Sequence, residues 1–181
     1  MPAITGERIG DWIQTFTGRQ FWPLDPYWTE VDIIDIAHAL SMLCRYGGHS
    51  RRFYSVAEHS VLISHRVPKE HALFGLLHDA AEAYVVDVPR PLKHQLPDYI
   101  EIENNVHNAI KCAFGLRFAE PAEVKDADLR ICVDEMRVLM VNRHSWRNHD
   151  NLEPLGVPIS CWSPTEAERR FLERFTELTS C

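Results

Sequence analysis

Long apolar runs are missing from this sequence of 181 residues, and no stretch approaches the roughly 20 consecutive apolar residues that a transmembrane helix needs. The first residues have neither the basic start nor the apolar run of a secretory signal peptide. Cys-x-x-Cys pairs are absent, and five scattered cysteines argue against a zinc knuckle or a disulfide framework. We therefore expect a cytoplasmic protein without a membrane segment and with reduced thiols at Cys44, Cys112, Cys132, Cys161 and Cys181.

Positive charge is also scarce. Lysine and arginine together number 19 against 26 aspartates and glutamates, which gives a net charge of −7 at pH 7. A protein that binds duplex nucleic acid needs a basic face for the phosphates, so we do not expect such a duplex as a partner. A single nucleotide remains compatible with this charge, because a metal ion and a few local cations suffice to bind its phosphates.

Helical spacing of apolar residues recurs over most of the chain and predicts one all-α domain over residues 1–181, with no evident strand, repeat or linker. Residues 1–34 contain three glycines and many aromatics, and we expect them to form an irregular cover of the core. Two prolines are expected to keep residues 85–93 free of helix. Helices are predicted from an N-cap at Asp35 to residue 44, from Ser55 to residue 66, over 68–84, over 97–114, from Pro121 onward, and over 163–178.

The stretch at residues 76–83 places an imidazole and two carboxylates in an apolar helical run. Glu82 follows His78 by four residues and Asp79 by three, so the three side chains share one face of a helix. A charged aspartate beside an apolar stripe is costly unless it is compensated, and a divalent cation is the usual compensation. The alternative is a surface aspartate next to a core histidine.

Two further residues extend this pattern. His59 falls in the second turn of the helix that begins at residue 55, where a lone histidine more often fills a core than binds a metal. Asp128 lies on the apolar side of the helix that follows Pro121. The competing acids on that helix, Asp126 and Asp134, reach solvent more easily.

In chain order, His59, His78-Asp79 and Asp128 resemble the H…HD…D signature of the HD-domain phosphohydrolases. Residues 78–82 and 87–93 resemble the pattern HD-x-x-E…D-x-P-x-P-x-K of the small nucleotidase branch of that family, and the segment at 125–128 resembles its last-ligand segment, which favours Asp128 over Asp126. The resemblance covers about residues 35–140. It implies an α-helical bundle that holds one divalent transition metal ion (Zn, Co, Mn, Ni or Fe) through His59, His78, Asp79 and Asp128.

The same resemblance implies roles for other residues. Glu82 corresponds to a catalytic glutamate that orients or deprotonates water, and Asp87 to an acid near the scissile ester. Arg45 corresponds to an arginine that clamps phosphate, and Tyr46 to an aromatic residue that packs on the sugar and disfavours a 2′-hydroxyl. Further substrate-binding residues, for a longer phosphate chain or for the base, are expected at His49, Arg52, Lys93 and Trp22.

A deoxynucleotide is the implied substrate, and two activities stay open. The additional cationic residues favour release of triphosphate from a dNTP, as in the phage dATP triphosphohydrolases, and the alternative is 5′-deoxynucleotidase action on dNMPs. A non-catalytic nucleotide-binding HD protein is a third reading. Ala83 stands where hydrolases of guanosine tetraphosphate carry an aspartate, which argues against that substrate. His94 and His107 fall where branches with a second metal need histidines, and we also expect a homo-oligomer.

Overall fold

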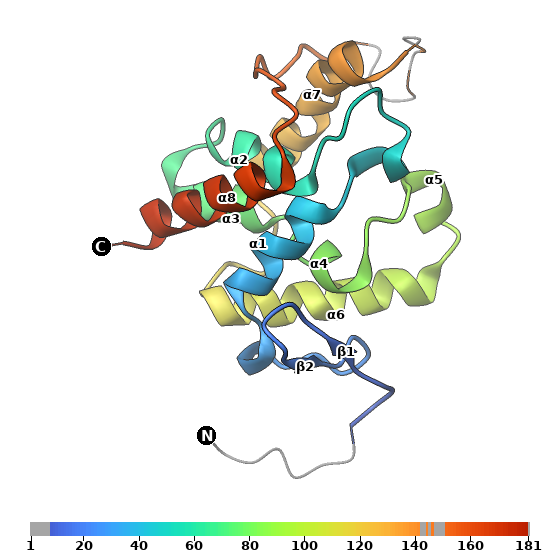
Figure 1. Ribbon diagram of the computed structural model, residues 1–181, viewed down its shortest axis with the longest axis vertical. Coiled ribbons are helices and arrows are strands. Elements are labelled where there is room, and N and C mark those ends of the chain that lie inside the picture. Colours follow the sequence, from blue (N-terminus) through green and yellow to red (C-terminus); the bar gives the residue numbers. More distant parts are fainter. Residues whose placement is uncertain (1–7, 142–143, 145, 147–150, 181) are drawn as a thin grey trace.

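The computed structural model describes residues 8–141, 144, 146 and 151–180. Over these residues the regular secondary structure is helical apart from one small antiparallel sheet, which confirms the all-α prediction (Figure 1). In chain order the elements are β1 (Ile13–Gln14), β2 (Gln20–Phe21), the 3₁₀ turn η1 (Trp28–Glu30), α1 (Ile33–Met42), the 3₁₀ turn η2 (Arg45–Gly48), α2 (Val56–Ser64), the 3₁₀ turn η3 (Lys69–His71), α3 (Ala72–Leu77), α4 (Glu82–Val85), α5 (Arg90–Lys93), α6 (Pro97–Phe114), α7 (Ala122–Leu139) and α8 (Pro164–Thr179).

Side-chain caps begin two helices where the sequence predicts them. At α2 the side chain of Ser55 accepts a hydrogen bond from the backbone N–H of Glu58 at 3.0 Å. At α8 Ser163 accepts from the backbone N–H of Glu166 at 3.3 Å. The predicted end of α6 is also confirmed, since Gly115 follows it with φ 65°, in the left-handed region that glycine adopts without steric cost.

The start of α1 differs from the prediction, because Asp35 is not its cap. The cap is Asp32, whose side chain accepts from the backbone N–H of Ile34 at 2.9 Å. Asp35 lies inside the helix and is buried, and it accepts hydrogen bonds from the backbone N–H and the hydroxyl of Thr17 at 2.6 and 3.0 Å. This carboxylate therefore ties the N-terminal hairpin to α1.

The single helix predicted over residues 68–84 is wrong, because η3, α3 and α4 divide this segment. Between α3 and α4 the chain makes a tight turn in which the N–H of Glu82 donates to the carbonyl oxygen of Asp79 at 3.0 Å. Such i→i+3 hydrogen bonds are those of a 3₁₀ helix, in which side chains three residues apart eclipse one another. Asp79 and Glu82 therefore stay on one side of the chain although the α-helix ends before His78.

Two other local predictions are wrong. A hairpin forms where no strand was expected: Ile13 pairs with Phe21, and Gly18 closes the turn with φ 83°. Strands of two residues are too short to produce an alternating pattern in the sequence. The helical turn α5 forms despite its prolines, because Pro91 lies in the first turn, where a helix does not need the missing N–H.

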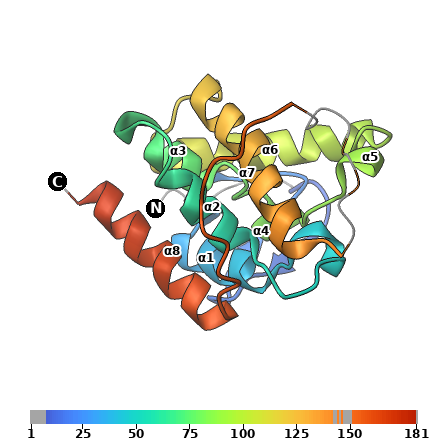
Figure 2. The same cartoon turned by 90° about the horizontal axis from the view of Figure 1, so that it is seen from above.

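The main core lies where α8 packs across α1 and α2, with α3 beside α2 (Figures 1 and 2). Phe171 on α8 is fully buried and Phe175 packs against the same cluster, which confirms the predicted inner face of that helix. Ile36 from α1 and Leu76 from α3 are fully buried in it as well, and Phe21 from the hairpin closes it. The hairpin thus covers one side of the core through Phe21.

A second buried cluster holds α7 against α2 and α3. Val124, Ala127 and Ile131 of α7 pack there with Ile63 of α2 and Phe74 of α3. The apolar face of α7 predicted from the sequence is therefore the face that packs. This contact brings together the helices that carry the site described below.

No helix among the described residues is long and apolar enough to cross a bilayer. Four cysteines are free thiols, in line with the prediction, while Cys181 lies outside the described residues. Of the four, Cys112 is exposed and the others are partly buried.

Candidate metal centre

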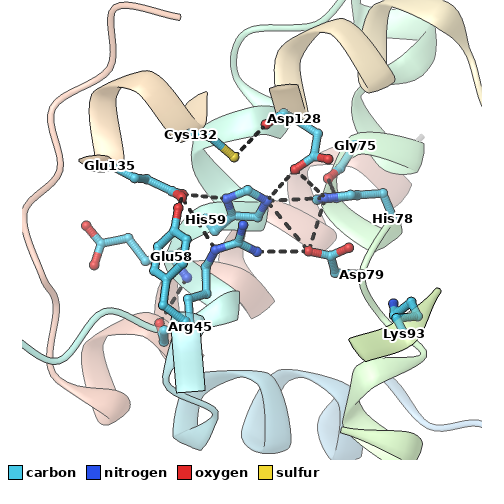
Figure 3. A network of polar contacts seen from close by, with 12 residues as sticks. Arg45, Glu58, His59, Gly75, His78, Asp79, Lys93, Asp128, Cys132 and Glu135 are labelled. Atoms are coloured by element: carbon cyan, nitrogen blue, oxygen red, sulfur yellow. Dashed lines mark hydrogen bonds and ion pairs between the residues drawn. The ribbon is translucent and has the colours of Figure 1, made fainter. Parts of the chain in front are cut away.

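Three separate elements bring histidine and carboxylate side chains to one point (Figure 3). His59 comes from α2, whose residues are all buried; His78 directly follows α3; and Asp128 lies on α7. One nitrogen or oxygen atom from each lies within 4.8 Å of the other two. Within the described part of the chain, this is the one group of three or more such side chains that could hold a metal ion.

The distances within this group suit a metal ion. Nε2 of His59 lies 3.3 Å from Nε2 of His78 and 3.2 Å from Oδ1 of Asp128, and Nε2 of His78 lies 3.9 Å from the same Oδ1. Ligand atoms bound tetrahedrally at about 2.0–2.1 Å from zinc lie about 3.4 Å from one another. Two imidazole nitrogens that both present lone pairs do not attract each other, so a cation between them would compensate for their proximity.

Asp79, predicted as a fourth ligand, approaches the same two nitrogens. Its Oδ2 lies 3.3 Å from Nε2 of His78 and 3.6 Å from Nε2 of His59. The same oxygen accepts a hydrogen bond from Nη1 of Arg45 at 3.2 Å. Asp79 is not part of the group of three defined above, so its role as a ligand stays a prediction.

The outer nitrogen of each histidine has an oxygen partner. Nδ1 of His59 lies 2.6 Å from Oε1 of Glu135, and Nδ1 of His78 lies 2.9 Å from the carbonyl oxygen of Gly75. An oxygen acceptor holds the proton on Nδ1 and leaves the lone pair on Nε2, which is what a metal ligand requires. Both histidines therefore present Nε2 to the same point.

The charges around this point are strongly coupled. Burial lowers the pKa of His78, but the carboxylates of Asp79 and Asp128 outweigh it and raise that pKa to about 9. Burial would raise the pKa of Asp79, yet the neighbouring imidazoles and Arg45 hold it well below its ordinary value. Without a cation, a proton on His78 thus balances the carboxylates at the position where an ion would lie.

Glu82, predicted to be catalytic, is buried next to these groups. Its Oε2 atom has no hydrogen-bond partner among the described residues. Burial, followed by the negative charges of Asp79 and Asp87, raises the pKa of Glu82 well above its ordinary value, and Lys93 acts in the opposite direction. Lys93 also lies 2.7 Å from a carboxylate oxygen of Glu103. The structure therefore brings Glu82, Asp87 and Lys93 near one another, while their catalytic and binding roles stay predictions.

Arg45 and Tyr46, predicted to bind substrate, lie beside the candidate metal group. Besides its contact with Asp79, Arg45 places Nε 3.6 Å from Oε2 of Glu135. The hydroxyl of Tyr46 donates a hydrogen bond to that same oxygen. The Arg45 guanidinium lies 5.5 Å from the centre of the Tyr46 ring, within the distance of a cation–π contact.

Three other predicted binding residues make their contacts elsewhere. Arg52 is exposed and donates to the carbonyl oxygen of Ser160 at 3.3 Å. His49 is exposed at the end of η2. One face of the Trp22 ring is covered by the guanidinium of Arg8, 4.2 Å from the ring centre. These contacts do not support a role in substrate binding, which stays a prediction for all three.

The remaining alternatives from the sequence lie outside the group. Asp126 pairs with Arg130 at 3.2 Å on the exposed side of α7, which leaves Asp128 as the candidate ligand of that helix. His94 is exposed, and burial lowers the pKa of His107 to about 4. Neither histidine belongs to the candidate metal group.

The sequence alone does not identify Glu135 or the contacts of Glu58. Glu135 lies two helical turns after Asp128 on the same helix, and that spacing is the one local signal that points to it. The buried carboxylate of Glu58 accepts hydrogen bonds from the backbone N–H groups of Ser160, Cys161 and Trp162 at 2.8, 3.0 and 2.6 Å. Figure 2 shows the segment before α8 passing over α2, and no sequence pattern joins residues so far apart.

Fold and site together define an all-α protein with a candidate metal centre of two histidines and an aspartate. No protein-family model matches the chain. It is 38% identical over 172 residues to "Uncharacterized protein YfdR" of Escherichia coli, across 92% of this chain and 95% of that protein. It is 33% identical over 126 residues to "Uncharacterized protein RCAP_rcc00048" of Rhodobacter capsulatus, across 64% of each. The chain belongs to the family of YfdR, and neither name states an activity.

Proposed function

We propose that the protein is a metal-dependent phosphohydrolase that acts on deoxynucleotides. The observation that carries this proposal is the pair of histidines whose Nε2 atoms lie 3.3 Å apart while both Nδ1 atoms contact oxygens. A histidine that only fills a core needs no second imidazole and no carboxylate at its inner nitrogen. The reaction class comes from the resemblance of His59, His78-Asp79 and Asp128 to the HD-domain signature.

The proposed ligands of one divalent transition metal ion are His59, His78, Asp79 and Asp128. Imidazole nitrogens together with carboxylate oxygens suit Zn, Co, Mn, Ni or Fe. When bound, such an ion polarises a phosphate and lowers the pKa of a coordinated water. The two aspartates offset the positive charge of the ion, and the oxygen partners of both Nδ1 atoms keep the imidazoles in the ligand tautomer.

Glu82 is proposed to transfer the proton. Burial and the charges of Asp79 and Asp87 raise its pKa, so the protonated carboxyl group is more accessible than in an ordinary glutamate, which suits general acid–base catalysis. Its Oε2 atom, which has no partner among the described residues, is available to a water molecule or to the leaving group. Asp87 helps to raise this pKa through its negative charge and is the second proposed catalytic acid.

Arg45 and Lys93 are proposed to bind the phosphate group. Arg45 donates through Nη1 to Asp79 and lies 3.6 Å from Glu135 through Nε, and its guanidinium is proposed to contact a phosphate oxygen as well. Lys93 is close enough to Glu82 to lower its pKa. Tyr46, fixed beside Arg45, is proposed to pack on the deoxyribose.

The contacts of the outer cations favour a short phosphate chain. A triphosphate needs donors for its β and γ groups, and the sequence offers His49, Arg52 and Lys93 for them. Arg52 instead donates to the carbonyl oxygen of Ser160. We therefore place 5′-deoxynucleotidase action on dNMPs first and dNTP (dATP) triphosphohydrolase action second.

Product analysis tests the proposal. Protein loaded with Co²⁺ or Mn²⁺ is incubated with each dNMP, each dNTP and the matching ribonucleotides, and the products are separated by chromatography. We expect orthophosphate and deoxynucleoside from dNMPs, whereas triphosphate released from dATP supports the second activity instead. If none of the nucleotides yields a product, the proposed hydrolase function is contradicted. Asp128→Ala is expected to lose metal and activity together, and Asp126→Ala, the matched control on the same helix, to keep both.

A further inference from the structure

Glu135, the partner of Nδ1 of His59, is a fully buried carboxylate on α7. Its two oxygens face different partners: Oε1 lies 2.6 Å from Nδ1 of His59, while Oε2 accepts the hydroxyl of Tyr46 and lies 3.6 Å from Nε of Arg45 (Figure 3). A buried charge is costly unless it is paired and hydrogen-bonded. Here each oxygen has a close partner, His59 at Oε1 and Tyr46 at Oε2, and Arg45 supplies an opposite charge, which indicates that the position is built for an ionised carboxylate.

The contact through Oε1 decides which nitrogen of His59 carries the proton. With Glu135 as acceptor, the proton lies on Nδ1 and the lone pair lies on Nε2, toward His78 and Asp128. Without this acceptor the other tautomer becomes accessible, and its proton on Nε2 would point at the place proposed for the ion. The carboxylate also makes the imidazole a stronger donor.

The contacts through Oε2 fix the groups proposed to face the nucleotide. Tyr46 has a backbone φ of 59°, a left-handed conformation that is uncommon for a bulky residue and needs support from its surroundings. Its hydroxyl bond to Glu135 supplies such support and sets the direction of the ring. The guanidinium of Arg45 forms an ion pair with the same oxygen through Nε.

We propose that Glu135 is a positioning residue with two tasks: one oxygen fixes the metal-binding tautomer of His59, and the other fixes the Arg45–Tyr46 pair at the nucleotide. The inference rests on the proposed function, because it requires both a metal ion and a nucleotide. It links two properties that would otherwise vary separately, namely metal affinity and recognition of the sugar phosphate.

Glu135→Gln tests both tasks with little change of shape. A glutamine has one acceptor oxygen and one NH₂ group, so it cannot accept hydrogen bonds on both sides. If its oxygen faces His59, the NH₂ group faces Arg45, which keeps Asp79 but loses the counter-charge of Glu135. If the amide is reversed, the NH₂ group donates to Nδ1 of His59, and the ring proton moves to Nε2.

Co²⁺ binding without nucleotide, measured by competition with a chelator, is the first readout. Losing the outer partner of a metal-ligating histidine typically weakens metal binding about 10–100-fold. Glu135→Leu leaves Nδ1 of His59 without this acceptor, and we expect it to raise the Kd for Co²⁺ by about this factor. Asp126→Asn changes an exposed carboxylate on the same helix and is expected to keep the wild-type Kd. A wild-type Kd in Glu135→Leu overturns the first task, and Glu135→Gln with both a wild-type Kd and a wild-type KM overturns the proposal.

Tyr46→Phe isolates the second task and leaves the buried charge in place. We expect an unchanged Kd for Co²⁺, a higher KM for the deoxynucleotide, weaker discrimination against the ribonucleotide and a nearly unchanged kcat. Unchanged KM and discrimination overturn this task, even if circular dichroism shows that Glu135→Gln does not fold. A wild-type protein that binds no Co²⁺ contradicts the proposed function itself, whereas equal binding by wild type and Glu135→Leu contradicts only the role of Glu135.

Discussion

Metal binding by this protein should depend steeply on pH, because a proton on His78 occupies the candidate centre. With a pKa of about 9, His78 is protonated at neutral pH, and a metal ion must displace that proton to reach Nε2. For one displaced proton, lowering the pH from 8 to 6 weakens binding about 90-fold, or about 2.7 kcal/mol. A histidine with an ordinary pKa of about 6.5 would give only about a fourfold change over the same interval.

Co²⁺ titrations at pH 6, 7 and 8, with competition by a chelator of known protonation, measure this dependence directly. Calorimetry in two buffers of different ionisation enthalpy counts the protons released, and about one per ion is expected at pH 7. The control is His107→Gln, because a histidine whose pKa is lowered to about 4 stays neutral throughout this range. A fourfold change in affinity, or no proton release, would refute the reasoning about His78.

The same proton has the opposite consequence for the metal-free fold. The pKa of His78 is higher in the folded protein, at about 9, than its ordinary value of 6.5. His78 therefore stabilises the folded state fully below pH 6.5, and this contribution is lost as the pH rises through about 9. Urea unfolding of the metal-free protein should accordingly show lower stability at pH 9 than at pH 6.5, while metal binding becomes tighter.

Two further predictions concern catalysis and packing. Glu82→Gln should retain Co²⁺ and nucleotide binding while kcat falls by about 10²-fold or more, and near-normal turnover would make Glu82 a structural residue. A Cβ atom at Gly75 would lie 3.2 Å from Cγ2 of Val67 and 3.3 Å from Cγ2 of Ile63. Gly75→Val should therefore lower the free energy of unfolding by about 1–3 kcal/mol, measured in urea, and weaken Co²⁺ binding by separating α3 from α2; wild-type stability would contradict this close packing.

Features of the fold that depend only on residues close together in the sequence could be predicted from it. Ser55 and Ser163 begin their helices because each side chain accepts from an N–H three residues further on, within the same segment. Gly115 ends α6 for an equally local reason. The apolar face of α7 follows from its helical period, and that face carries Asp128 toward His59.

Features that depend on tertiary contacts could not be predicted in this way. Asp35 has the residue type and position of an N-cap, yet its carboxylate binds Thr17 in the hairpin. Glu58 fits a capping box, yet it accepts three backbone N–H groups from the segment before α8. Glu135 resembles any acidic residue of a polar helix, and only the docking of α7 on α2 places it against His59. In each case a carboxylate accepts hydrogen bonds from groups that lie far away in the sequence.

The two histidines of the candidate centre differ in what holds them. His78 is held by the carbonyl oxygen of Gly75 in its own segment, whereas His59 is held by Glu135 on α7, the helix that also carries Asp128. Separation of α7 from α2 would therefore remove a proposed ligand and the partner of His59 in one step. An ion bound between these side chains would join α2, α3 and α7, so that its binding free energy would also stabilise the docking of α7. Metal affinity and the packing of Ile131 against α2 thus report on the same contact between helices.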